Sequence, residues 1–205
     1  MGSSRFPKKI LSYVNGITIL ELLMSRLDQA KSVDMCVIAT STNKIDDELF
    51  EFCATRNYKT FRGSENDLLD RHYQCALKYK PSSISKIPSD VPFIDPKLID
   101  QVIELFNKGT YDFVSTLHPP TFPDGLDAET FSFDALKTAW EKADKDYERE
   151  HTTPYIWDNP KKFRIGSVKS DQKKNYFMNY RWTIDYKEDL EFMRAVYDDF
   201  IKYNP

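Results

Sequence analysis

Two aspartates follow stretches of the sequence that are expected to be strands. Asp90 comes after Ile84–Ile87 and a Pro-Ser turn, and Asp185 ends the stretch Arg181–Ile184. Open α/β sheets bind ligands outside the carboxyl ends of their strands. If the two strands are neighbours, both carboxylates can converge on one cation, and Mg²⁺ is commonly held by one or two carboxylates plus substrate phosphates. The structural alternative is that Asp90 caps a turn, since Asp is a common turn residue.

The first nine residues combine small and basic side chains. The small ones are Gly2, Ser3 and Ser4, and the basic ones are Arg5, Lys8 and Lys9. Small residues let backbone amides approach an anion, and the basic side chains suit phosphate oxygens. An unstructured terminus is the alternative, because many expression tags begin in the same way. Taken together with the two aspartates, this segment indicates nucleoside triphosphate chemistry.

The composition excludes several classes of protein. The chain has 205 residues and a formal net charge of -3, which argues against a nucleic-acid binder. No apolar run approaches the roughly 20 residues of a membrane span, and no signal peptide is recognisable. Cys36, Cys53 and Cys75 lack CxxC spacing, so we expect buried free thiols in a reducing compartment and a cytoplasmic protein.

Strand and helix patterns alternate along most of the chain. A capping box at Thr18–Glu21 begins an amphipathic helix that ends near Ala30, and the apolar run Met35–Thr40 predicts a strand buried on both faces. The other expected strands lie at 58–61, 84–87, 111–117, 163–168 and 180–184, and the other expected helices at 46–53, 68–77, 96–108, 133–143 and 187–203. This alternation predicts an α/β fold with a mostly parallel twisted sheet and helices on both faces.

We expect a single domain over residues 1–205, with a small excursion at about 119–170. That excursion holds a turn-rich loop and a segment, 147–157, that concentrates charge, a histidine and aromatic side chains. A surface helix with alternating ion pairs, each worth little to stability, would have this composition.

Six blocks of the sequence match a known family pattern in the correct order. They are GSSRFPKK (2–9), FRGSENDLLDR (61–71), DVPFIDP (90–96), PTFPDGLD (120–127), EREHTTPYI (148–156) and RWTID (181–185). In these blocks the chain resembles the SpsF-like cytidylyltransferases of the spore-coat polysaccharide type, which are relatives of the CMP-sialate and CMP-KDO synthetases. The resemblance covers nearly the whole chain and is more specific for the family than for the substrate.

The resemblance implies a Rossmann-like nucleotidyltransferase fold, a three-layer sandwich. The implied reaction is transfer of CMP from CTP to an acidic, nonulosonate-type sugar with release of pyrophosphate, for surface polysaccharide biosynthesis. The implied cofactor is Mg²⁺, held by Asp90 and Asp185, with Arg5 and Lys9 on the triphosphate and a homodimer as the working form. The other residues implied near the nucleotide are Gly2, Ser3, Ser4, Thr40, Ser41, Arg62 and Ser64, and those facing the acceptor sugar or a neighbouring subunit are Asp124, Asp127, Glu150 and His151.

The chain departs from the family pattern in two ways. The family has a strand before the glycine-containing loop, and we expect that strand to be lacking here. Lys8 replaces a loop glycine, and Pro88-Ser89 replace the usual Thr-Gly. Two other functions therefore stay open: a truncated or inactive nucleotide-binding homologue, and a nucleotide-sugar-dependent glycosyltransferase in which Asp124 and Asp127 would be the metal carboxylates. The residues alone identify neither the acceptor sugar nor a preference for CTP over UTP.

Overall fold

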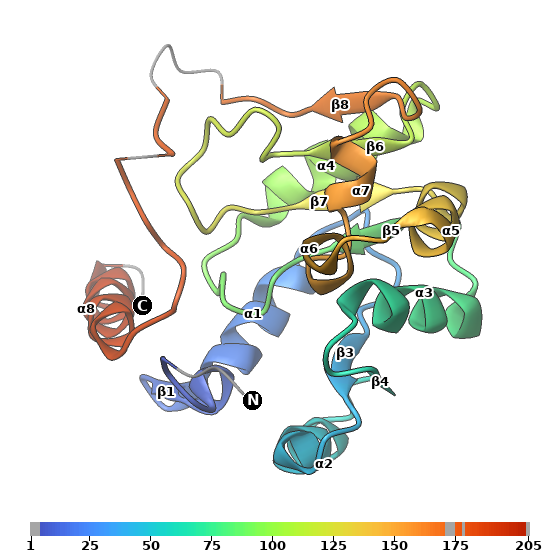
Figure 1. Ribbon diagram of the computed structural model, residues 1–205. Helices are drawn as coiled ribbons and strands as arrows, with labels where there is room; N and C mark the ends of the chain where they lie inside the picture. The colour runs from blue at the N-terminus through green and yellow to red at the C-terminus, as the bar shows by residue number, and fades with distance from the viewer. Residues whose placement is uncertain (1–4, 171–174, 178, 204–205) are drawn as a thin grey trace.

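The computed structural model describes residues 5–170, 175–177 and 179–203 (Figure 1). Its strands are β1 (Tyr13–Val14), β2 (Ile17–Thr18), β3 (Ile38–Ser41), β4 (Thr60–Gly63), β5 (Ile84–Lys86), β6 (Phe113–Ser115), β7 (Glu129–Phe131) and β8 (Ile165–Ser167). Its α-helices are α1 (Ile19–Leu27), α2 (Asp47–Thr55), α3 (Leu68–Tyr79), α4 (Pro96–Asn107), α5 (Phe133–Lys142), α6 (Asp146–Glu150), α7 (Pro154–Trp157) and α8 (Lys187–Tyr203). Short 3₁₀ segments lie at Lys9–Leu11 and Lys44–Asp46.

The predicted α/β fold class is confirmed, with strands arranged in separate sheets. β3 and β4 pair in parallel, and the larger sheet has the order β5-β7-β6-β8. Within it β5, β6 and β8 run in one direction, because β6 pairs in parallel with β8 and β7 is antiparallel to both β5 and β6. Among the described residues no strand joins β3 to β5, so each of these two strands has one edge without a partner strand.

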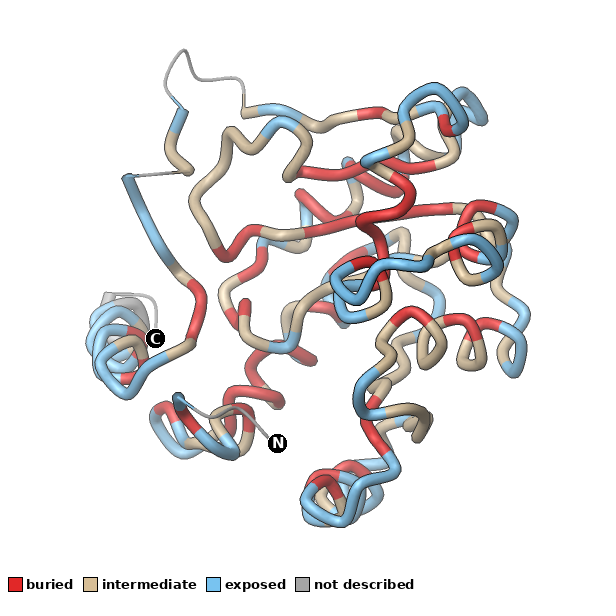
Figure 2. The backbone as a smooth tube through the Cα atoms, in the orientation of Figure 1, coloured by how far each residue is buried: buried red, intermediate tan, exposed pale blue. Residues whose placement is uncertain are grey.

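Helices cover both faces of the larger sheet (Figure 1). The register partners Phe113 and Phe131 face the cluster formed with α3, α5 and α7, while Val114 packs with Val102 of α4 on the opposite face. Successive residues of a strand point to opposite faces, so one three-residue strand contributes to both cores. Figure 2 shows the resulting buried layer running through the strands and the inner faces of the helices.

Helix starts follow the local signals in the sequence. The Thr18 hydroxyl accepts from the Glu21 backbone N–H at 3.2 Å, and a Glu21 carboxylate oxygen accepts from the Thr18 N–H at 2.8 Å, which completes the predicted capping box of α1. Pro96 occupies the first turn of α4, and the Asp95 carboxylate accepts from the Lys97 N–H at 2.9 Å. The segment that follows Asp90 is therefore fixed where it enters α4.

The C-terminal segment differs from the prediction. The expected strand 180–184 is wrong, because only an isolated bridge joins Arg181 to Asp124. The segment is nevertheless extended and anchored: the Trp182 N–H donates to the Asp124 carbonyl at 2.7 Å, and the Ile184 N–H donates to the Asp90 carbonyl at 2.9 Å. These bonds bring the loop after β5, the loop before β7 and the segment before α8 together.

The N-terminal region packs against α8. The turn Asn15-Gly16 joins β1 and β2 with φ of 45° and 85°, the left-handed pair that a two-residue hairpin requires. Val14, Ile184 and Met193 share one buried cluster, which fixes β1 beside the segment before α8. Within the described part of the chain, no helix combines the length and apolar character needed to span a bilayer.

Candidate active site

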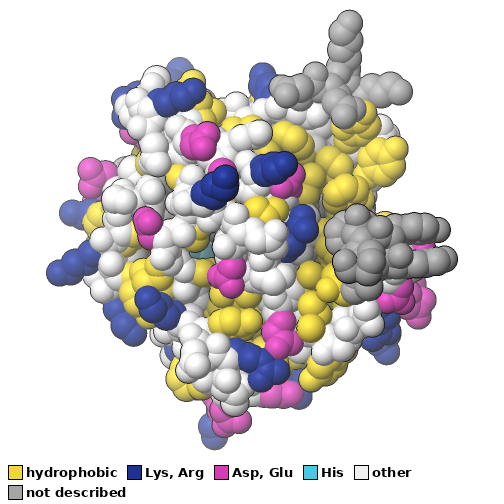
Figure 3. All heavy atoms as spheres, turned by 180° about the vertical axis from the view of Figure 1, so that it is seen from behind, with side chains coloured by type: hydrophobic (Ala, Val, Ile, Leu, Met, Phe, Trp, Pro, Cys, Tyr) yellow, Lys and Arg dark blue, Asp and Glu magenta, His cyan; other side chains and the backbone are white. Residues whose placement is uncertain are grey.

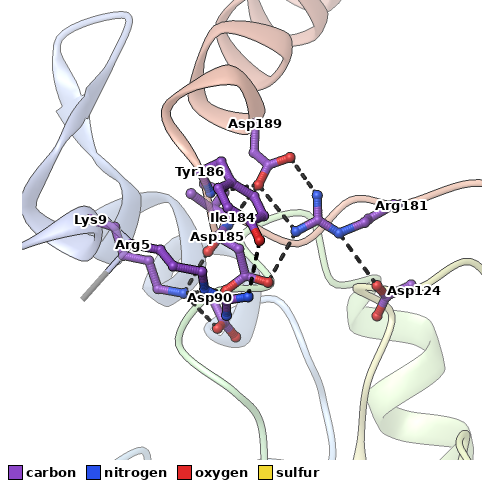
Figure 4. Close-up of polar contacts among 9 residues, drawn as sticks. All are labelled: Arg5, Lys9, Asp90, Asp124, Arg181, Ile184, Asp185, Tyr186 and Asp189. Atoms are coloured by element: carbon purple, nitrogen blue, oxygen red, sulfur yellow. Dashed lines mark hydrogen bonds and ion pairs between the residues drawn. The ribbon is translucent and has the colours of Figure 1, made fainter. Parts of the chain in front are cut away.

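Two carboxylates converge on the ammonium group of Lys9 (Figure 4). The Lys9 Nζ donates to Asp90 Oδ2 at 2.8 Å, to Asp185 Oδ1 at 3.1 Å and to the Ile184 carbonyl oxygen at 2.5 Å. The Lys9 side chain is only 13% exposed. Asp90 and Asp185 thus lie close together although they are far apart in the sequence, and one cation already sits between them.

Arginines surround this centre on the side of α8. Arg181 donates to Asp185 at 3.0 Å and to Asp189 at 2.6 Å, and its Nε lies 3.8 Å from Asp124. Arg5 donates to Asp185 at 3.1 Å. Burial alone would raise the pKa of Asp185, but the hydrogen bonds from Lys9 and Arg181 and the positive charges of Lys9 and Arg5 outweigh burial and lower it. Asp185 is therefore an ionised acceptor at neutral pH.

The oxygen atoms around Lys9 Nζ suit a hard divalent cation. Two carboxylates and one backbone carbonyl already surround a single positive charge at hydrogen-bond distance, and Mg²⁺ prefers oxygen ligands of this kind. Nowhere in the described part do three or more His, Cys, Asp or Glu residues gather as a metal group. Asp90 and Asp185 fit the one or two carboxylates that a protein supplies to a magnesium site whose remaining ligands include substrate phosphates.

The residues expected near the nucleotide lie at the carboxyl ends of β3 and β4. Thr40 and Ser41 donate their hydroxyl groups to Asp46, each at 2.7 Å. Arg62 donates to the carbonyl of Ser41 at 2.8 Å and to that of Asn43 at 2.9 Å. Their position agrees with the strand-end rule, and their side chains hold the loop together through hydrogen bonds within it.

Close packing at the end of β4 shapes the same loop. The Ser64 hydroxyl accepts from the Asp67 N–H at 3.1 Å, ahead of α3. A Cβ on Gly63 would meet the Arg71 Cγ at 2.9 Å. The Arg71 guanidinium donates to the carbonyl of Ser64 at 2.7 Å, and also bonds the carbonyls of Ala39 and Glu65. Arg71 thus ties the ends of β3 and β4 together, a role that the sequence did not reveal.

The residues expected to face the acceptor are not gathered in one place. Asp124 is linked to Asp185 through Arg181. Burial raises the pKa of both Asp124 and Asp127, that of Asp127 to about 6 with a further contribution from the Asp124 charge. Glu150 and His151 lie exposed at the end of α6. Gly2, Ser3 and Ser4 lie outside the described residues.

Several residues of the site were missed by sequence reasoning. Asp189 accepts from the backbone N–H groups of Asp185 at 2.7 Å and Tyr186 at 2.8 Å, in addition to bonding Arg181. A local feature of the sequence could have indicated this role. The segment from Arg181 leads directly into α8, so an acidic residue in the first turn of α8 lies close enough to bond to it. Nothing local indicated that Arg181 would also meet Asp124.

The fold and this arrangement of carboxylates at a sheet edge define a Rossmann-like nucleotidyltransferase class. A solved cytidylyltransferase from Leptospira borgpetersenii superimposes with a TM-score of 0.88 at 33% identity, over 95% of this chain and 82% of that one. A family model described as Cytidylyltransferase matches residues 1–204. The chain belongs to the cytidylyltransferase family.

Curated relatives agree with this membership. The spore coat polysaccharide biosynthesis protein SpsF of Bacillus subtilis is 34% identical over 96% of this chain and 82% of its own length. An uncharacterised protein of Methanocaldococcus jannaschii is 40% identical over 80% of this chain, which spans 66% of that protein. A 3-deoxy-manno-octulosonate cytidylyltransferase of Chlamydia trachomatis is 28% identical over 61% of this chain and 50% of its own length.

Proposed function

We propose that the protein transfers CMP from CTP to a hydroxyl group of an acidic sugar and releases pyrophosphate, with Mg²⁺ as cofactor. The observation that carries the proposal is the convergence of Asp90 and Asp185 on one cation at the carboxyl edge of the sheet, in a chain of the cytidylyltransferase family. A relative that acts on 3-deoxy-manno-octulosonate supports an acidic acceptor, and the similarity to SpsF supports a place in polysaccharide biosynthesis.

In this reaction the acceptor hydroxyl oxygen bonds to the α-phosphorus. The bond from that phosphorus to the oxygen bridging to the β-phosphate breaks, and pyrophosphate leaves with the electron pair. Arg5 and Lys9, which are bonded to Asp185 and Asp90 in the free protein, would bind the departing phosphates. The hydroxyl proton goes to a carboxylate base, and we propose Asp127 for this role, because it lies close enough to Asp90 for the two charges to interact and its pKa is raised to about 6.

Asp90 and Asp185 would hold the metal, and Mg²⁺ bound there would neutralise negative charge on the phosphate oxygens. Much of the rate would come from positioning, since phosphoryl-type transfer needs little covalent chemistry from the protein. The Arg181 bonds to Asp185 and Asp189 keep the Asp185 carboxylate in place for this purpose. Lys9 would exchange its carboxylate partners for the triphosphate.

Calorimetric titration of CTP, UTP, ATP and GTP, each with and without Mg²⁺, is the first test. We expect selective CTP binding that Mg²⁺ strengthens, followed by pyrophosphate release when 3-deoxy-manno-octulosonate is added. The Asp90→Ala variant should lose Mg²⁺-dependent turnover without unfolding, while Asp134→Ala, which removes an exposed carboxylate on α5, should keep it.

Three results would contradict the proposal. Normal turnover in Asp90→Ala would remove the metal assignment. Absence of binding for all four nucleotides would favour an inactive homologue. Transfer from a nucleotide sugar without pyrophosphate release would favour a glycosyltransferase.

A further inference from the structure

A second polar cluster lies at the same edge of the sheet, outside the residues already assigned. Lys86, the last residue of β5, donates to Glu129 Oε2 at 2.9 Å, and the two are register partners on neighbouring strands. The Thr153 hydroxyl lies 3.0 and 3.2 Å from the two carboxylate oxygens of Glu129. The Glu129 side chain is 4% exposed, whereas that of Lys86 is 20% exposed. Both oxygens of the buried carboxylate are thus hydrogen-bonded, and the Lys86 side chain is the more exposed of the two.

Lys86 has unused hydrogen-bonding capacity, in contrast to Lys9. An ammonium group has three donors. Lys9 uses its donors on two carboxylates and a carbonyl, but within residues 5–170, 175–177 and 179–203 Lys86 bonds only to Glu129. Cross-strand partners face the same side of a sheet, so Glu129 holds the Lys86 ammonium in place and leaves its other N–H groups for a ligand.

A neutral histidine borders the cluster. The His72 Nδ1 lies 2.7 Å from the Leu68 carbonyl oxygen and 3.1 Å from the Thr152 hydroxyl. Burial lowers the pKa of His72 to about 4, so the ring is neutral at pH 7. With the Nδ1 proton donated to the carbonyl, Nε2 is an acceptor, and in the described part of the chain no group bonds to it. A lysine with unused donors and a histidine with an unused acceptor suit a ligand that carries both an anionic group and hydroxyl groups.

The cluster connects the metal centre to the segment expected to face the acceptor. Lys86 lies four residues before Asp90, and Thr153 follows directly on His151 and Thr152 between α6 and α7. Asp127 lies near enough to both Glu129 and Asp90 for their charges to raise its pKa. The nucleotide, in contrast, is expected at the ends of β3 and β4 and beside Arg5. We propose that Lys86 binds the carboxylate of the acidic sugar acceptor and so selects acidic over neutral sugars.

This inference rests on the proposed function, and its test separates the two. The single variant Lys86→Met would leave Glu129 buried without its partner and could unfold the protein. The double variant Lys86→Met/Glu129→Gln removes both charges and keeps an acceptor for Thr153. Lys137→Met removes an exposed lysine on α5 and is the matched control.

Two measurements are made on the unmodified protein, the double variant and Lys137→Met. The first is calorimetric binding of CTP with Mg²⁺, and the second is saturation-transfer NMR of 3-deoxy-manno-octulosonate in the presence of CMP and Mg²⁺. We expect CTP affinity to stay unchanged and the affinity for the sugar acid to fall at least about tenfold in the double variant, the effect of losing a charge-assisted hydrogen bond. Where turnover is measurable, the acceptor KM should rise and the CTP KM should not.

A double variant that binds the sugar acid as tightly as the unmodified protein would overturn the inference, because Lys86 would then serve only to neutralise Glu129. Unmodified protein that binds CTP but not the sugar acid would overturn it as well and leave nucleotide binding standing. Protein that binds no CTP would refute the proposed function first, and the inference with it.

Discussion

Replacing Lys9 with methionine should open the site between Asp90 and Asp185 to divalent cations in the absence of nucleotide. The ammonium group occupies the position between the two carboxylates, and the Ile184 carbonyl completes its surroundings. A divalent cation must therefore displace Lys9 before it can bind both aspartates. Methionine keeps most of the apolar side chain but brings no charge.

The expected gain in metal affinity follows from the distances. The carboxylate oxygens lie 2.8 and 3.1 Å from the same nitrogen, and so within about 6 Å of each other, where two like charges repel by roughly 3 kcal/mol at an effective dielectric constant near 20. Lys9 relieves that repulsion in the unmodified protein, whereas in Lys9→Met a bound cation would relieve it. Since about 1.4 kcal/mol corresponds to a factor of ten, the apparent dissociation constant should fall by about tenfold to a hundredfold.

Mn²⁺ titration followed by electron paramagnetic resonance, without nucleotide, measures this effect directly. We expect weak binding to the unmodified protein and to Lys137→Met, and tighter binding to Lys9→Met that a second change, Asp90→Asn, abolishes. Equal Mn²⁺ affinity in Lys9→Met and the unmodified protein would refute the view that Lys9 occupies the metal position. The same variant should bind CTP more weakly, because Lys9 is assigned to the phosphates.

Three further variants test other parts of the structure. Asp127 has a folded-state pKa near 6, above its usual 3.8, so its contribution to stability is present below pH 4 and is lost as the pH rises through 6. In urea denaturation, Asp127→Asn should therefore raise the free energy of unfolding by up to roughly 3 kcal/mol at pH 8 and by little at pH 4. Gly125→Ala, at φ 101° with the new Cβ 2.6 Å from the Trp182 carbonyl carbon, should lower the melting temperature and weaken CTP binding by displacing the segment before α8. Thr18→Ala should cost about 1 kcal/mol in the same denaturation assay through loss of the α1 cap; an unchanged midpoint would count against the cap.

The fold was predictable wherever a local signal determines an element. The capping box at Thr18 and the proline at the start of α4 placed both helices correctly. β7 was missed because its three residues, Glu129–Phe131, form a strand only through pairing with β5 and β6. The segment 180–184 was wrongly predicted to be a strand, because its alternating residues form only an isolated bridge.

The candidate site was predictable to the extent that it follows the strand-end rule. Asp90 and Asp185 were expected to meet, and their convergence on Lys9 agrees with that expectation, although their role in metal binding stays a prediction. The roles of Arg181 and Lys86 depend on which strands and loops are neighbours, and the sequence carries no local record of that. The homodimer and the magnesium cofactor also stay predictions.

Charged side chains are arranged differently at the candidate site and over the wider surface of the molecule. Figure 3 shows basic and acidic side chains interspersed over the face of the molecule that is seen from behind. At the sheet edge, by contrast, Lys9, Arg5 and Arg181 are all paired with carboxylates. A polyphosphate can gain Lys9 and Arg5 only if another positive charge takes over Asp90 and Asp185. Nucleotide and metal should therefore strengthen each other's binding, and because such coupling is reciprocal, the Mg²⁺ dependence of CTP affinity and the CTP dependence of metal affinity should be equal in magnitude.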